Sequence, residues 1–253
     1  MRKIYAIAHY EYKMLITRWG TWGVFWVSVF LCLSDNYPSA HNLARLEFLC
    51  QPAYFLYRIV SLDILILIFG LLFLLSGRFP ADRKYGLHPL FMTLPLHKRH
   101  YLTGKLLGGW FYTLTMLCLF LGVNFFVYSL AAPFKMDAAD CIASFVKTLS
   151  VSILPVSLFI GICSTALADL LDIRLFYLLT AILFLLNVTT VGSALPMPFY
   201  LITSGDLAKL IWTHPEYPRI PSASVLANCL FLAGGGLLCM GLLAVGHRPW
   251  RAE

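Results

Sequence analysis

The sequence has few charged residues. Asp, Glu, Lys and Arg make up 12% of the 253 residues, whereas 60% are apolar; an ordinary soluble domain has about 25% charged residues. The mean hydropathy is +0.78, so the chain has too little polar surface to cover a water-soluble globule of this size. The composition excludes a soluble domain and predicts an integral membrane protein.

Motifs for catalysis, metals and nucleotides are also missing. The chain contains no GxxxxGK[ST] phosphate-binding loop, no HExxH and no GxSG, and its seven cysteines show no CxxC spacing. We therefore expect no metal site and no enzyme activity in this chain, which disfavours an intramembrane protease. Nucleic-acid binding is not expected, because the basic residues are not interleaved along a soluble domain. A disulfide between Cys50 and Cys141 stays open, since both could face outside.

Long apolar runs dominate the sequence. A membrane-spanning helix needs about 20 apolar residues, and six runs approach or exceed this length. We predict an all-α integral membrane protein, a single transmembrane permease domain over residues 1–253, with spans at Trp19–Leu33, Leu56–Leu75, Leu106–Ala131, Leu149–Leu170, Leu175–Val191 and Ser224–Val245.

Lysine and arginine are distributed unevenly between the two sides of such a bundle. With both termini in the cytoplasm, 13 of the 19 basic residues lie in cytoplasmic segments and 5 in outer segments, with Arg58 inside the second span. Basic short loops stay on the cytoplasmic side. The pattern predicts a multi-pass protein of the cell membrane, N-in and C-in. The outer loop 192–223, rich in proline and aromatic residues, is either re-entrant or interfacial.

Two cytoplasmic elements stand out. Residues 1–18 are too polar to span, and their apolar positions follow helical spacing, which predicts an interfacial amphipathic helix; a plain extension of the first span is the alternative. The segment Arg78–Lys105 contains six of the 19 basic residues. Pro89 can start a short helix there and Pro95 can end it. Such a helix suits docking to a partner, whereas a plain basic loop would only fix the topology.

The segment Arg78–Lys105 resembles the cytoplasmic loop of type 2 ATP-binding-cassette (ABC) exporter permeases. The matching positions are Asp82, Gly86, Leu90, Phe91, Pro95, Lys98 or Arg99, Gly104 and Lys105. The N-terminal sequence HYEYKMLITR, with Glu11 ahead of Lys13 and Arg18, is similar to the opening helix of that family. His88 and Pro89 stand where the family usually has Leu-Glu.

The resemblance implies a permease that exports a peptide, antibiotic or lipid-like substrate. Two copies of a separate ATPase would bind ATP and Mg²⁺, so this chain itself binds no cofactor, and a second permease, identical or related, would complete the transporter in the lipid bilayer. The residues implied in the ATPase contact are Gly86, Leu90, Phe91, Met92 and Pro95, with a supporting contact from Glu11. A stand-alone secondary transporter, channel or membrane sensor component without an ATPase is the alternative.

Arg58 and Asp63 are ionisable residues within the second predicted span, and such residues are functional hypotheses by default. They are five residues apart, about 140° around a helix, so they are not expected to form a pair on one face. Arg58 is expected near the outer surface. Asp63 is a candidate for a substrate path or a dimer interface, with a structural hydrogen bond to a neighbouring helix as the alternative.

Overall fold

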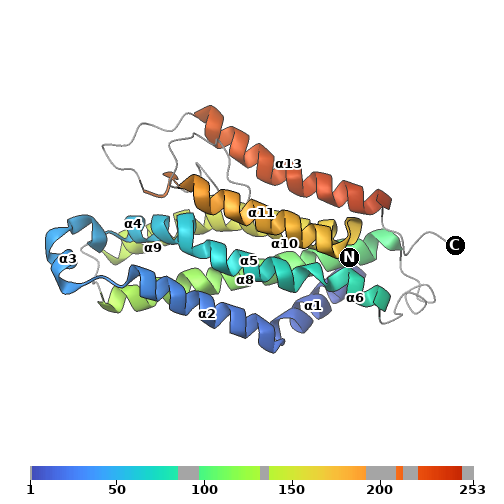
Figure 1. The fold of residues 1–253 in the computed structure, drawn as a ribbon, viewed down its shortest axis with the longest axis horizontal. Helices are drawn as coiled ribbons and strands as arrows, with labels where there is room; N and C mark the ends of the chain where they lie inside the picture. The colour runs from blue at the N-terminus through green and yellow to red at the C-terminus, as the bar shows by residue number, and fades with distance from the viewer. Residues whose placement is uncertain (1, 85–96, 132–136, 192–208, 213–221, 247–253) are drawn as a thin grey trace.

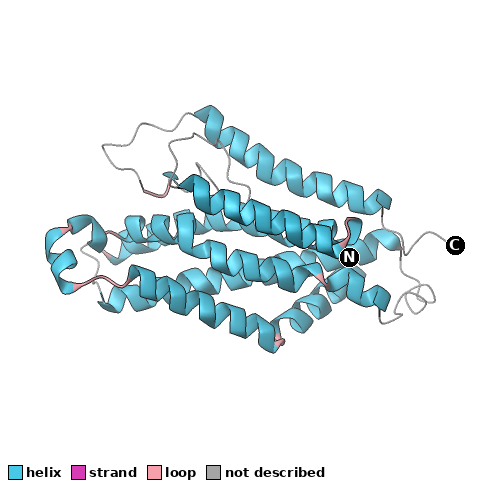
Figure 2. Ribbon diagram, viewed as in Figure 1, coloured by secondary structure: helices cyan, strands magenta, loops and turns pink. Residues whose placement is uncertain are grey.

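The structure is a computed structural model that describes residues 2–84, 97–131, 137–191, 209–212 and 222–246. Within these ranges every regular element is a helix and there is no strand (Figure 2). The long helices lie side by side along the long axis of the molecule (Figure 1). In chain order the elements are α1 (Arg2–Ile16), α2 (Trp19–Asn36), α3 (Ala40–Arg45), η1 (Glu47–Cys50), α4 (Pro52–Arg58), η2 (Ile59–Asp63), α5 (Ile64–Ser76), α6 (Arg78–Lys84), α8 (Lys98–Ala131), α9 (Ala138–Thr148), η3 (Leu149–Ile153), α10 (Leu154–Leu170), α11 (Ile173–Val191) and α13 (Ser222–Gly246).

The all-helical membrane fold expected from the apolar runs is confirmed. Four helical stretches are long and apolar enough to cross a membrane, and a fifth is reached if α1 and α2 together form one bent span. The apolar stretch of α11, Ile173–Leu185, is shorter. Each of the six expected ranges lies on helix, while six spans and the N-in, C-in orientation stay predictions. The four stretches are Pro52–Pro80, Arg99–Leu130, Ala138–Leu170 and Val225–Val245.

Two of the long helical stretches contain a π-helical turn. One is η2, between α4 and α5, and the other is η3, between α9 and α10. A π turn inserts an extra residue into the helix, and such turns are frequent at functional sites. Asp63 is the last residue of η2.

The junction between α1 and α2 is a bend of 62°. The last carbonyl groups of a helix lack partners within it, and here side chains of α2 supply them. Thr21 Oγ1 donates to the carbonyl oxygen of Leu15 at 2.8 Å, and Trp22 Nε1 donates to that of Ile16 at 2.9 Å. Thr21 Oγ1 also lies 3.0 Å from Tyr112 Oη of α8. Hydrogen bonds from α2 side chains to the end of α1, and from Thr21 to Tyr112 of α8, therefore hold the bend in place.

The core of the bundle is centred on α5. Leu67, Ile68, Leu71 and Leu75 of this helix are fully buried, and α2, α8, α10 and α11 pack around it. In contrast, α13 exposes Leu230, Leu237 and other large apolar side chains. Exposed apolar faces of this kind are expected where helices contact lipid.

Candidate functional site: a buried ion-pair network around Glu11

Three helices meet at the end of the bundle where the chain begins. These are α1, α6 and the first turns of α8 (Figure 1). The helices α6 and α8 flank residues 85–96 in the sequence, the part of the chain predicted to dock on an ATPase. The helices on both sides of that segment, α6 and α8, therefore contact the N-terminal helix.

Glu11 of α1 and Arg78 of α6 form a buried ion pair. Arg78 Nε lies 2.5 Å from Glu11 Oε1, and Arg78 Nη2 lies 3.0 Å from Glu11 Oε2. The side chains are only 7% and 3% exposed, respectively. Two parallel bonds between a guanidinium and a carboxylate fix both distance and orientation. Arg78 Nη2 also contacts Met14 Sδ at 3.4 Å, so the arginine is bound to α1 at two adjacent turns.

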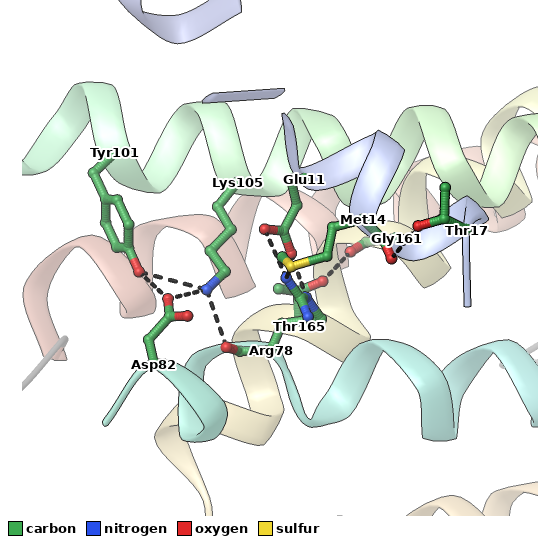
Figure 3. A network of polar contacts seen from close by, with 9 residues as sticks. All are labelled: Glu11, Met14, Thr17, Arg78, Asp82, Tyr101, Lys105, Gly161 and Thr165. Carbon is green, nitrogen blue, oxygen red and sulfur yellow. Dashed lines mark hydrogen bonds and ion pairs between the residues drawn. The ribbon is translucent and has the colours of Figure 1, made fainter. Parts of the chain in front are cut away.

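Lys105 of α8 forms the second half of the network. Its Nζ donates to the backbone carbonyl oxygen of Arg78 at 3.0 Å and pairs with the carboxylate of Asp82 in α6. Tyr101 Oη donates to the same carboxylate oxygen (Figure 3). The Lys105 ammonium also lies 4.6 Å from the centre of the Phe79 ring, a cation–π distance.

The network contains two cations and two anions, Arg78 and Lys105 with Glu11 and Asp82. Burial of single charges is strongly unfavourable, and it is tolerated when the charges are paired and hydrogen-bonded. Removing one partner of a buried pair costs about 3–5 kcal/mol because the other charge stays buried. These four residues therefore hold α1, α6 and α8 in one relative arrangement.

Glycines bring α1 against the backbone of α8 next to this network. A Cβ atom at Gly108 would lie 2.7 Å from the carbonyl oxygen of Ala8 and 2.7 Å from Glu11 Cβ. At Gly104 it would lie 2.8 Å from Ile7 Cβ. Small residues four apart allow such close helix contact in membrane proteins. Glu11 reaches Arg78 from a helix that rests directly on α8.

The close packing continues from α8 to α10. A Cβ atom at Gly161 would lie 2.7 Å from Trp110 Cα, and Trp110 Nε1 donates to Ser157 Oγ at 3.2 Å. On its other side α10 packs against α13, where Cys163 Sγ lies 3.4 Å from Cys239 Sγ. The backbones of α8 and α10 are therefore in direct contact at Gly161 and Trp110.

The structure places the predicted ATPase-contact residues as follows. Glu11 is buried and points to Arg78 (Figure 3). Asp82 and Lys105, which belong to the family-like pattern, are bonded to each other. The remaining predicted contacts lie outside the described residues: Gly86, Leu90, Phe91, Met92 and Pro95.

Arg58 and Asp63 bind different partners on α2. Arg58 Nη2 pairs with Asp35 Oδ2 at 2.7 Å, and both side chains are partly exposed. Asp63 is buried and accepts a hydrogen bond from Asn36 Nδ2 at 2.5 Å. The separation expected from the helical spacing agrees with this, since the two residues do not pair with each other.

Sequence reasoning missed the roles of Arg78, Tyr101 and Lys105. Arg78 was assigned to topology alone, because it lies in a basic segment between apolar runs, and Lys105 was identified only as a position of the family-like pattern. One signal was available: Glu11 is the single acidic residue among the first 18, and a buried acid beside a membrane helix needs a cation. Its partner could not be chosen among six basic residues without the packing.

Neither a metal-binding cluster nor a disulfide is found among the described residues. Within them, no group of three or more His, Cys, Asp or Glu side chains could hold a metal ion. Cys50 and Cys141 are free thiols. A scan against models of known protein families finds no match, and a search of curated proteins finds no relative of this chain.

Proposed function

We propose that this chain is the membrane-spanning permease subunit of an ABC exporter. It moves a peptide, antibiotic or lipid-like substrate across the cell membrane, with energy from ATP hydrolysed by a separate ATPase subunit. Two ATPases and a second permease, identical or related, complete the transporter. The chain itself performs no catalysis.

The observation that supports this function is the position of the ion-pair network. Its residues belong to the helices on both sides of the segment predicted to dock on the ATPase, and to the N-terminal helix. Lys105 joins α8 to α6 through Asp82, and Arg78 joins α6 to α1 through Glu11. If Arg78–Lys105 served only to fix the topology, it would need basic charge, but it would not need bonds between its first helix, α6, and Lys105 at its end.

The network gives a mechanical account of coupling. A push on residues 85–96 reaches α6 and α8 together, because Lys105 binds the carbonyl and carboxylate groups of α6. The ion pair with Glu11 passes the movement to α1. The hydrogen-bonded bend then carries it into α2. Closure of the ATPases would thus tilt several membrane helices at once.

Co-purification tests the proposal. The tagged full-length chain is purified from its own cells in mild detergent, and the eluate is assayed for Mg²⁺-dependent release of phosphate from ATP. We expect an ATPase subunit in the eluate, identified by mass spectrometry, with ATPase activity that follows the tag. Leu90→Asp places a charge on the predicted docking helix, so it should abolish this association.

The matched control is His41→Asp, which adds the same residue at an exposed position of α3, at the opposite end of the bundle (Figure 1). This variant should keep the ATPase. The proposal fails if the pure chain transports with an ion gradient alone in vesicles, or if Leu90→Asp retains full ATPase association.

A further inference from the structure

Asp63 occupies an unusual place in the bundle. It ends the π turn η2 in the middle of a continuous helical stretch, and only 7% of it is exposed. It faces the last turn of α2, where Asn36 Nδ2 donates to its Oδ2. A carboxyl group at such a site contacts another helix of the same chain, with little surface for substrate or a second copy.

The Asp63 carboxyl group has no ion-pair partner among the described residues. Arg58 is the nearest basic residue on the same helical stretch, but its guanidinium is bound to the side chain and backbone carbonyl of Asp35 at 2.7 and 3.3 Å. Within the described part of the chain, no lysine or arginine forms an ion pair with Asp63. The other titratable groups near it are Cys32 and Asp35 of α2, while the neighbouring helix α5 has no charged residue.

The side-chain amide of Asn36 has an oxygen atom without a hydrogen-bond donor among the described residues. Its Nδ2 donates both to Asp63 Oδ2 at 2.5 Å and to the carbonyl oxygen of Cys32 at 2.8 Å. Its Oδ1 is buried and has no hydrogen-bond partner among the described residues. A buried acceptor without a donor costs about 1–3 kcal/mol. The site therefore has, side by side, one unpaired acceptor and one carboxyl group that forms no ion pair with a described residue.

One proton satisfies both groups. A protonated carboxyl group has an O–H donor, and a carboxylic acid and a primary amide can form two antiparallel hydrogen bonds. The amide N–H would donate to one carboxyl oxygen, as it does in the structure, and the acid O–H would donate to Asn36 Oδ1. Protonation also removes the unfavourable burial of an unpaired charge.

We propose that Asp63 is a proton-binding site, loaded with one proton from water, and that the acid–amide pair with Asn36 joins α2 to η2. Loss of the proton leaves a buried carboxylate and an unpaired amide oxygen, so it weakens the contact between the two helices. The site is separate from the ion-pair network and does not depend on the proposed export function.

Infrared spectroscopy of the full-length protein in lipid vesicles tests the site directly. At neutral pH we expect a carbonyl band of a protonated carboxylic acid that shifts in D₂O and is lost in Asp63→Asn. The matched control Asp140→Asn removes an exposed carboxylate in the first turn of α9 and should keep the band. The proposal is overturned if wild type and Asp63→Asn show the same carboxylic-acid absorption. Loss of the band when sodium chloride replaces choline chloride would instead identify a metal-cation site and also overturn it.

The pH dependence of stability gives a second readout. In the unfolded chain an aspartate releases its proton near pH ~4, whereas the proposed site keeps it when folded. Above pH ~4 the folded state therefore holds one proton more than the unfolded state. The contribution of Asp63 to stability is complete below this pH and falls as the pH rises. Asp63→Asn imitates the neutral acid and should remove this fall from the melting curve in detergent. An unchanged pH profile in Asp63→Asn would contradict the proposal.

Discussion

Replacement of Arg78 by glutamine tests whether the buried ion pair holds the N-terminal helix in place. The change removes the cation and leaves the Glu11 carboxylate, which is 7% exposed, without its bidentate partner. Breaking a buried pair in this way costs about 3–5 kcal/mol. For a chain of 150–250 residues each kcal/mol lowers Tm by about 2–4 °C, so we expect Arg78→Gln to melt about 6–20 °C below wild type.

The assay is thermal unfolding of the purified protein in detergent. Arg99→Gln is the matched control, since Arg99 is exposed in the first turn of α8, and a surface change of this kind stays within about 0.5 kcal/mol. The double variant Glu11→Gln with Arg78→Gln leaves no buried charge unpaired at this contact. The loss of unfolding free energy in the double variant should therefore be smaller than the sum of the losses in the two single variants.

Additivity of the two single changes would refute the reasoning. A coupling energy within about 0.5 kcal/mol of zero is the value found for residues that do not interact. That result would mean that Glu11 and Arg78 contribute independently, and that the network does not hold α1 against α6.

Two further predictions concern close contacts between helices. Gly108→Ala should lower thermal stability, because its Cβ would lie 2.7 Å from a backbone carbonyl oxygen of α1. Gly122→Ala is the control: its Cβ would have no neighbour within 4 Å, and it should be neutral or stabilising because alanine favours helix. Equal effects of the two changes would contradict the close packing. Mild oxidation with a hydroperoxide should join Cys163 to Cys239, whose sulfur atoms are 3.4 Å apart. Mass spectrometry of alkylated protein should then find two fewer free thiols than before oxidation, and a Cys163→Ser variant should show no such loss; an unchanged count in the wild type would show that the thiols do not meet.

The helices were predictable because they follow from apolar runs. Membrane spans need about 20 apolar residues in sequence, and each expected range lies on a helix. The ends were less well predicted. The third span was expected to begin at Leu106, but α8 begins at Lys98. Tyr101 and Lys105 bind Asp82 of α6 and can therefore lie inside the protein.

The candidate site was only partly predictable, for a physical reason. A local pattern identified Glu11 and the family-like spacing around Asp82 and Lys105, and helical geometry separated Arg58 from Asp63. Pairing is a long-range property: Glu11 and Arg78 are 67 residues apart, and the register of α1 on α8 depends on two glycines that permit close approach. Sequence periodicity contains no information on which helices meet.

The buried ion-pair network also bears on the order in which the chain is assembled. Glu11 is synthesised before Arg78 and Lys105, so the N-terminal helix is already present when these basic residues reach the membrane surface. A chain that started after residue 16 would insert Arg78 with no carboxylate from α1 to receive it. We therefore expect tags or truncations that disturb the N-terminal helix to impair the insertion of helices far along the chain.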